Sequence, residues 1–149
     1  MRALLMAAAV GVAASLTGFA SAAPPVAVSI QIHPIPPFQA GTWDASGAID
    51  DSGTYERTDV HGTGSLPDCF CILEHTGTFQ ETFVLTGSGG TLTIKAEEQV
   101  TPDGTPFGQE TGVWQVVSGT GDYVRASGHG TDVFGPPLTL YLTGLVSKS

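Results

Sequence analysis

Apolar and polar residues alternate with a period of two along most of the chain after residue 37, and Gly- or Pro-rich turn signals separate the alternating segments. This period is typical of strands whose side chains point to opposite faces. No window of a dozen residues shows the 3.6-residue apolar period of an amphipathic helix. The pattern therefore predicts an all-β chain that forms a single closed antiparallel barrel of about eight strands. A β-sandwich with the same strand spacing is the alternative.

The turn signals divide the chain into expected strands and connections. Strands are expected at residues 38–49, 54–61, 72–86, 91–100, 113–118, 123–134 and 138–146. The connections between them include a turn at 50–53 and a long loop at 101–112. Residues 26–32 also alternate, but five prolines surround them, so this lead-in is either a first strand or a disordered tail.

A Gly-rich corner separates the two expected strands that follow the long loop. Gly119 and Gly121 permit a positive φ or a close backbone approach there. Tyr123 is expected to begin the next strand and to lock the corner by packing. Gly128 lies on one face of that strand, where a missing side chain lets a sheet bend as a closing barrel requires. These four residues are the expected structural positions of the fold.

The same corner carries a family resemblance. The run Gly-Thr-Gly-Asp-Tyr-Val-Arg-Ala-Ser-Gly at 119–128 resembles the signature of allene oxide cyclases and dirigent proteins. The resemblance implies a small calycin-like barrel of eight antiparallel strands, of a kind also found in bacterial secreted proteins of unknown role. It further implies a cavity that steers the conformation of a reactive ligand. It transfers no catalytic residue by position, so enzyme activity is left open.

Residues 1–22 have the three parts of a secretory signal peptide. Arg2 supplies the positive charge, residues 4–19 are apolar and small, and Ala20-Ser21-Ala22 fits a cleavage site. A transmembrane anchor is the alternative, which the modest apolar length disfavours. The expected organisation is a signal peptide (1–22), a Pro-rich lead-in (23–37) and a barrel domain (38–149), secreted to the periplasm or the medium.

The charge of the chain limits its partners. Five basic and 14 acidic side chains give a formal net charge of −9, which disfavours nucleic acid and anionic membrane surfaces. No second apolar segment is long enough to span a bilayer, so no membrane association is expected of the mature form. A homo-oligomer is left open as a partner state.

Two glutamates interrupt otherwise apolar stripes on neighbouring expected strands. The stripes are Phe79, Glu81, Phe83 and Leu85, and Leu92, Ile94, Ala96, Glu98 and Val100. If the stripes face inward, desolvation raises the pKa of Glu81 and Glu98 and makes them candidate catalytic acids or bases. The alternative is that each lies at a wet strand end or pairs with Arg57, Lys95 or Arg125.

Four aromatic residues are candidates to line a ligand cavity. They are Trp43, Phe79, Phe83 and Trp114. The alternative is that they belong to the packed core.

Cys69 and Cys71 are the only cysteines, and export favours a strained local disulfide between them. Free thiols, or a soft-metal site completed by Glu74 and His75, are the alternatives. No metal or other cofactor is expected.

Two functions fit these observations. The first is a secreted barrel that binds a small apolar molecule, with cyclase or isomerase activity implied by the family resemblance. The second is a non-catalytic secreted module with a fully packed barrel. The chain has no Gly-x-Ser-x-Gly elbow, no His-Glu-x-x-His motif and no phosphate loop, so hydrolase, kinase and nucleotide-binding functions lack support.

Overall fold

Eight antiparallel strands form a closed barrel in the computed structural model, which describes residues 24–64, 77–101 and 109–148. The strands are β1 (Val26–Ile35), β2 (Ala40–Gly47), β3 (Asp51–Gly64), β4 (Gly77–Gly87), β5 (Gly90–Thr101), β6 (Gln109–Gly119), β7 (Ala126–Gly135) and β8 (Thr139–Lys148). Each strand pairs with the next, and β8 pairs with β1. Within the described ranges, no helix has the length and apolar content needed to cross a bilayer.

The all-β closed barrel expected from the alternation is therefore confirmed, and the sandwich is excluded. The lead-in contributes β1, which pairs with both β2 and β8 and closes the barrel. The expected signal peptide and the Cys69–Cys71 pair lie outside the described residues.

Several expected boundaries were wrong, and three of them change the assignment of residues that matter for the fold. Residues 51–53 were assigned to a turn, but Asp51 pairs with Ala45 and begins β3. Residues 109–112 were assigned to a loop because prolines and glycines precede them, but they pair with β5 and form the start of β6. Tyr123 was expected to begin a strand, but it ends the short 3₁₀ helix η1 (Gly121–Tyr123), and β7 begins three residues later.

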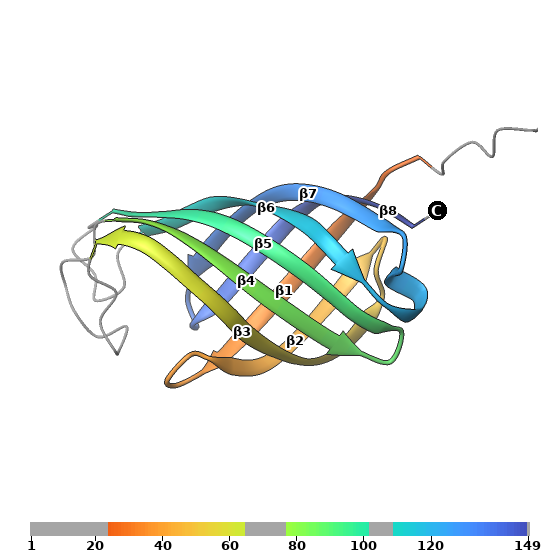
Figure 1. Ribbon diagram of the computed structural model, residues 1–149, viewed down its shortest axis with the longest axis horizontal. Coiled ribbons are helices and arrows are strands. Elements are labelled where there is room, and N and C mark those ends of the chain that lie inside the picture. Colours follow the sequence, from red (N-terminus) through yellow and green to blue (C-terminus); the bar gives the residue numbers. More distant parts are fainter. Residues whose placement is uncertain (1–23, 65–76, 102–108, 149) are drawn as a thin grey trace, which may run out of the picture.

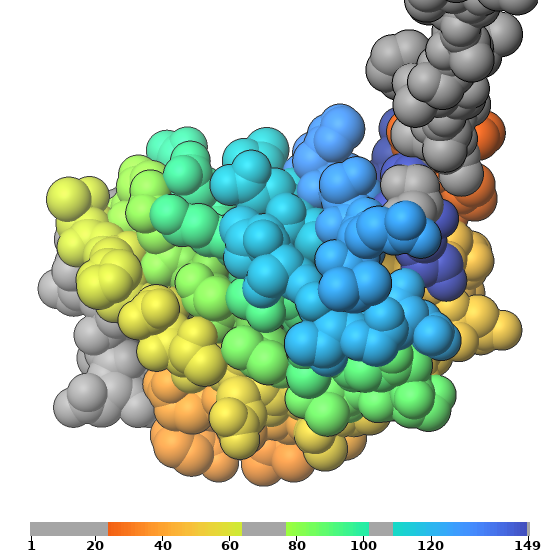
Figure 2. Space-filling model, turned by 45° about the vertical axis from the view of Figure 1, so that its right-hand side comes forward, coloured from red at the N-terminus to blue at the C-terminus, as the bar shows by residue number. Residues whose placement is uncertain are grey.

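The two ends of the barrel differ in their connections (Figure 1). One end carries the β1–β2 and β7–β8 hairpins, whose turns both contain a Pro-Pro pair followed by a residue with positive φ, Phe38 or Leu138. The other end carries the β4–β5 turn, helix η1 and both described termini. On the face seen in Figure 2, side chains of β4, β5, β6 and β7 form a continuous wall.

Alternating residues of every strand fill the barrel with apolar side chains. The core includes Val28, Ile30, Ile32, Trp43, Ala45, Ile49, Tyr55, Phe83, Leu85, Leu92, Ile94, Ala96, Trp114, Tyr123, Phe134, Leu140, Leu142 and Val146. Outward positions between them are mostly Thr, Ser, Gln and charged residues. This inside–outside alternation follows from the pleat of the strands, and burial of these side chains is the main stabilising term.

Glycines make room for the indole of Trp114 inside the barrel. Trp114 pairs with Gly130, which pairs in turn with Gly144. A Cβ atom at Gly144 would lie 2.7 Å from the Trp114 ring. The indole Nε1 donates to the carbonyl oxygens of Thr131 and Thr143, at 3.1 and 3.3 Å. The ring is thus a packed element of the wall, with its polar atom satisfied.

Asp51 ties together the connections at the η1 end. Its carboxylate accepts hydrogen bonds from the Tyr123 hydroxyl at 2.7 Å, from the Ser88 hydroxyl and backbone N–H, and from the N–H groups of Ser52 and Gly89. Burial would raise the pKa of Asp51, but these hydrogen bonds outweigh it and hold the pKa well below its ordinary value. The Tyr123 ring is buried, and its hydroxyl also donates the hydrogen bond to Asp51.

Gly121→Val is expected to lower the free energy of unfolding by about 1–3 kcal/mol. Gly121 has φ +59°, and an added Cβ would collide with the Gly89 carbonyl oxygen. Gly135→Val is the control, because only the Tyr141 ring, at 3.8 Å, lies near its Cβ position. Urea unfolding measures both variants. An unchanged midpoint for Gly121→Val would contradict a strained corner.

Candidate functional site: an acidic cluster inside the barrel

Five charged side chains point into the barrel from five consecutive strands. They are Arg57 on β3, Glu81 on β4, Glu98 on β5, Glu110 on β6 and Asp132 on β7. All four acids are buried, and only 8% of the Arg57 side chain is exposed. We call these five residues the interior acidic cluster. A buried charged group is costly unless it is paired or protonated, so each member needs a physical account.

The strand register brings two of the acids onto one glycine. Glu98 pairs with Gly112, and Gly112 pairs with Asp132. A Cβ atom at Gly112 would lie 2.7 Å from Asp132 Oδ1 and 2.9 Å from Glu98 Cγ. The absence of a side chain at Gly112 therefore leaves room for the Asp132 carboxyl group and for the stem of Glu98 at the same point of the wall.

A β-bulge turns Arg57 into the barrel. Tyr55 and Arg57 both point inward, and the register then shifts between Arg57 and Asp59. Asp59 consequently pairs with the outward Thr82 and is exposed. The Arg57 guanidinium donates from Nη1 to Glu81 Oε1 at 3.0 Å. Burial still raises the pKa of Glu81, because the attraction of Arg57 offsets only part of the desolvation.

Glu98 and Glu110 form a carboxyl pair that shares a proton. The hydrogen bond between them raises the pKa of Glu98 and lowers the pKa of Glu110, so protonated Glu98 is the donor and Glu110 is the acceptor. Burial first, and then the charges of Glu110, Glu81 and Asp132, raise the pKa of Glu98 well above its ordinary value. Burial and the same carboxylate repulsion raise the pKa of Glu110 to about 8.

Asp132 has no hydrogen-bond partner among the described residues. The residue is 1% exposed, and both carboxyl oxygens are buried. Burial, with a further contribution from the charge of Glu81, raises its pKa to about 7. Asp132 therefore changes protonation near neutral pH, where an acid–base group is most effective.

Among the described residues, no group of three or more His, Cys, Asp or Glu side chains is placed to hold a metal. Two atoms besides those of Asp132 are buried without a hydrogen-bond partner in the described structure, Glu98 Oε1 and Arg57 Nε. Buried polar atoms without partners are uncommon in folded proteins, and each needs an explanation such as a bound water, an ion, strain or a catalytic role.

The two predicted catalytic residues, Glu81 and Glu98, have different surroundings within the cluster. Glu81 and Glu98 are both buried and inward, as expected from their stripes. Glu81 is held by Arg57, one of the partners named in the alternative, whereas Glu98 keeps one oxygen without a partner. Glu110 and Asp132 were not predicted from the sequence. Asp132 could have been predicted, because it shares one face of its strand with Gly128 and Gly130. Glu110 could not, because residues 101–112 were assigned to a loop.

The four predicted ligand-lining aromatics are all buried. Trp43, Phe83 and Trp114 belong to the packed core, and the Trp43 indole donates to the Thr86 carbonyl at 3.2 Å. Phe79 and Phe83 flank Glu81 on β4, where Phe79 pairs with Glu98 and Phe83 pairs with Arg57. These two rings are thus placed to contact a molecule at the interior acidic cluster.

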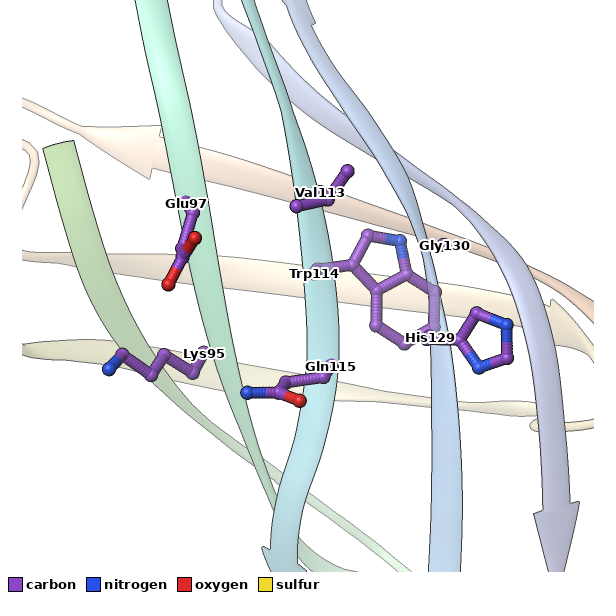
Figure 3. A pocket seen from close by; sticks show the side chains of 7 residues that line it. All are labelled: Lys95, Glu97, Val113, Trp114, Gln115, His129 and Gly130. Atoms are coloured by element: carbon purple, nitrogen blue, oxygen red, sulfur yellow. The ribbon is translucent and has the colours of Figure 1, made fainter. Parts of the chain in front are cut away.

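An open depression of about 430 Å³ lies on the outer side of β5, β6 and β7 (Figure 3). Lys95, Glu97, Val113, Gln115 and His129 extend around it from the three strands. All five are outward-facing residues, with 54% of Val113 exposed. The depression lacks the enclosed polar groups of the interior acidic cluster, so we do not assign a site to it.

A hydroxyl, an imidazole and a carboxylate also line up on the outer wall. His33 Nδ1 lies 3.2 Å from Thr139 Oγ1, and His33 Nε2 lies 2.8 Å from Asp44 Oδ1. The order is that of a hydrolase triad. However, Thr139 is only 2% exposed, so its hydroxyl is not accessible to a substrate. We interpret these hydrogen bonds as a structural link between β8, β1 and β2.

The fold and the cluster together define a closed eight-stranded barrel with an acidic interior. No family model, curated protein or solved structure matches the chain. A function can therefore be argued only from the arrangement of the residues in this structure.

Proposed function

We propose that the barrel binds a small, largely apolar molecule at the interior acidic cluster and moves a proton on it, as a cyclase or isomerase does. The observation that carries the proposal is the buried Glu98–Glu110 pair, which holds a proton beside the unpartnered oxygens of Glu98 and Asp132. Such a cluster costs stability, since apolar side chains of the same volume would pack without a desolvation penalty. Strongly perturbed carboxyl groups are typical of acid–base sites.

The proposed chemistry needs neither an oxidant nor a second substrate. An isomerisation removes a proton from one carbon and returns a proton to another, so atoms and electrons balance within the ligand. Glu98 takes up the first proton at Oε1 while its own proton passes to Glu110. The pair then returns one proton to the ligand and ends with the single proton it began with. The resemblance to allene oxide cyclases at 119–128 is consistent with this class of reaction, but assigns it no residue.

Isomerisation of cyclohex-3-enone to its conjugated isomer tests the proposal with a small apolar probe that needs one proton moved. We expect the protein to accelerate the reaction and Glu98→Gln to reduce the rate by about 100-fold or more. Glu97→Gln is the matched control, since Glu97 is the next residue on β5, faces outward and contacts Gln80. Equal loss in both variants, or no acceleration by the parent protein, would contradict proton transfer at this site.

A non-catalytic packed module is the second candidate. The hydrogen-bonded indoles of Trp43 and Trp114 favour it, because they fill part of the barrel interior and leave no polar ring atom unsatisfied. The backbone amide of Gly112 distinguishes the two candidates. A change in its NMR shift with the ketone, with no change at Gly135, supports binding inside the barrel, and unchanged shifts at both support the packed module.

A further inference from the structure

We infer that the interior acidic cluster takes the primary ammonium group of an otherwise apolar ligand, held by Asp132 and Glu98. The inference deepens the proposed function, and rests on it only for entry of a ligand into the barrel. The first observation is the kind of buried side-chain atom that has no hydrogen-bond partner in the described structure. Three of these atoms are acceptor oxygens, Asp132 Oδ1, Asp132 Oδ2 and Glu98 Oε1. A primary ammonium group has three N–H donors and no acceptor, which matches this set in number and kind.

The second observation is that the side chains carrying these acceptors meet over one residue. Asp132 Oδ1 and Glu98 Cγ both approach the Cβ position of Gly112, from β7 and β5. A group bound there would meet the Asp132 carboxylate from one side of β6 and the Glu98 side chain from the other. Phe79, the pairing neighbour of Glu98, and Leu142, the pairing neighbour of Asp132, are both buried and apolar. The surroundings therefore suit an alkyl or aromatic body attached to the ammonium group.

The charges of the cluster select against other ligand classes. Its only cation, Arg57, already bonds to Glu81, and the remaining three acids have no cationic partner in the described structure. A ligand carboxylate would add a fifth negative group to four buried carboxyls, whereas an ammonium group compensates one of them. The one unpartnered donor, Arg57 Nε, belongs to a guanidinium whose charge Glu81 already balances.

Protonation of Asp132 should make the binding of an ammonium group depend on pH. The charges of Glu98 on β5, Glu110 on β6 and Glu81 on β4 interact with Asp132, whose β8 neighbour, Leu142, is apolar. Arg57 on β3, the cation of the cluster, is bonded to Glu81. Only the deprotonated carboxylate attracts an ammonium group, so binding competes with the proton. With a pKa of about 7 for Asp132, affinity should be roughly tenfold higher at pH 8 than at pH 6.

Three probes with the same six-carbon chain test the inference by calorimetry: hexylammonium, 1-hexanol and hexanoate. At pH 8 we expect hexylammonium to bind at least tenfold more tightly than 1-hexanol, and hexanoate to bind least. Asp132→Asn, which keeps the shape but removes the charge, should abolish the preference for hexylammonium and its dependence on pH. Glu97→Gln, which removes an outward carboxylate from β5, should change neither.

The outcomes separate the inference from the proposed function. If 1-hexanol binds as tightly as hexylammonium and Asp132→Asn has no effect, the ammonium inference is overturned, while binding inside the barrel stands. If Glu97→Gln weakens hexylammonium as much as Asp132→Asn does, the amine binds to surface charge and the inference is also overturned. If none of the probes shifts the Gly112 amide, both the inference and the proposed function fail.

Discussion

Replacing Arg57 by leucine should lower the free energy of unfolding by about 3–5 kcal/mol at pH 8, the cost of breaking a buried ion pair from one side. The guanidinium and the Glu81 carboxylate lie 3.0 Å apart, with 8% and 7% of their side chains exposed. Without Arg57, Glu81 is left as a buried acid that must either remain charged without compensation or take up a proton. Urea unfolding at pH 8 measures the loss.

Two variants make the Arg57 result interpretable. Arg57→Leu with Glu81→Leu removes both charges and should restore most of the stability, because neither partner is left unpaired. Arg125→Leu removes an exposed arginine and should change stability by less than about 0.5 kcal/mol. If the double variant were no more stable than Arg57→Leu, the loss would come from packing of the arginine stem and not from the orphaned carboxylate.

The second large effect is a loss of stability as the pH rises through neutrality. The folded-state pKa values of Glu98, Glu110 and Asp132 lie above their ordinary values, with Glu110 at about 8 and Asp132 at about 7. Between about pH 4 and pH 8 the folded chain therefore binds more protons than the unfolded chain, and the free energy of unfolding falls as pH rises. Each unit of pKa difference corresponds to about 1.4 kcal/mol, so we expect a change of several kcal/mol between pH 5 and pH 8.

Glu98→Gln combined with Asp132→Asn should flatten this dependence and raise stability at pH 8. The amides keep the shapes of the side chains and cannot lose a proton in this range. Asp51 acts in the opposite sense at lower pH, because its pKa is depressed and its stabilising contribution is lost as the pH falls toward the folded-state value. A parent protein with constant stability from pH 5 to pH 8 would contradict buried, protonated carboxyl groups.

Strand alternation made most of the fold predictable. The inward phases of Trp43, Glu81, Glu98 and Trp114 follow from a period of two, which survives as long as the strands are regular. The boundaries were less predictable, since composition assigned residues 51–53 to a turn and residues 109–112 to a loop, whereas both segments pair with neighbouring strands. The position of Tyr123 in a 3₁₀ helix depends on Asp51, 72 residues away, and no local pattern encodes it.

The interior acidic cluster could be predicted only in part. Glu81 and Glu98 stood out because each was the single carboxylate of an apolar stripe. The inward position of Arg57 depends on a β-bulge, without which Asp59 would share its face. The meeting of Glu98 and Asp132 over Gly112 depends on the register of three strands. These features are tertiary, and the spacing of residues in one strand does not contain them.

NMR titration of the side-chain carboxyl carbons of Glu98, Glu110 and Asp132 tests the central claim most directly. The account predicts that Asp132 titrates near 7, that Glu110 titrates near 8 and that Glu98 stays protonated well above its ordinary range. Glu97, outward on the same strand as Glu98, serves as the internal reference. Three midpoints near the ordinary value of about 4 would show ionised, solvated carboxyl groups and would contradict an acidic cluster that holds protons inside the barrel.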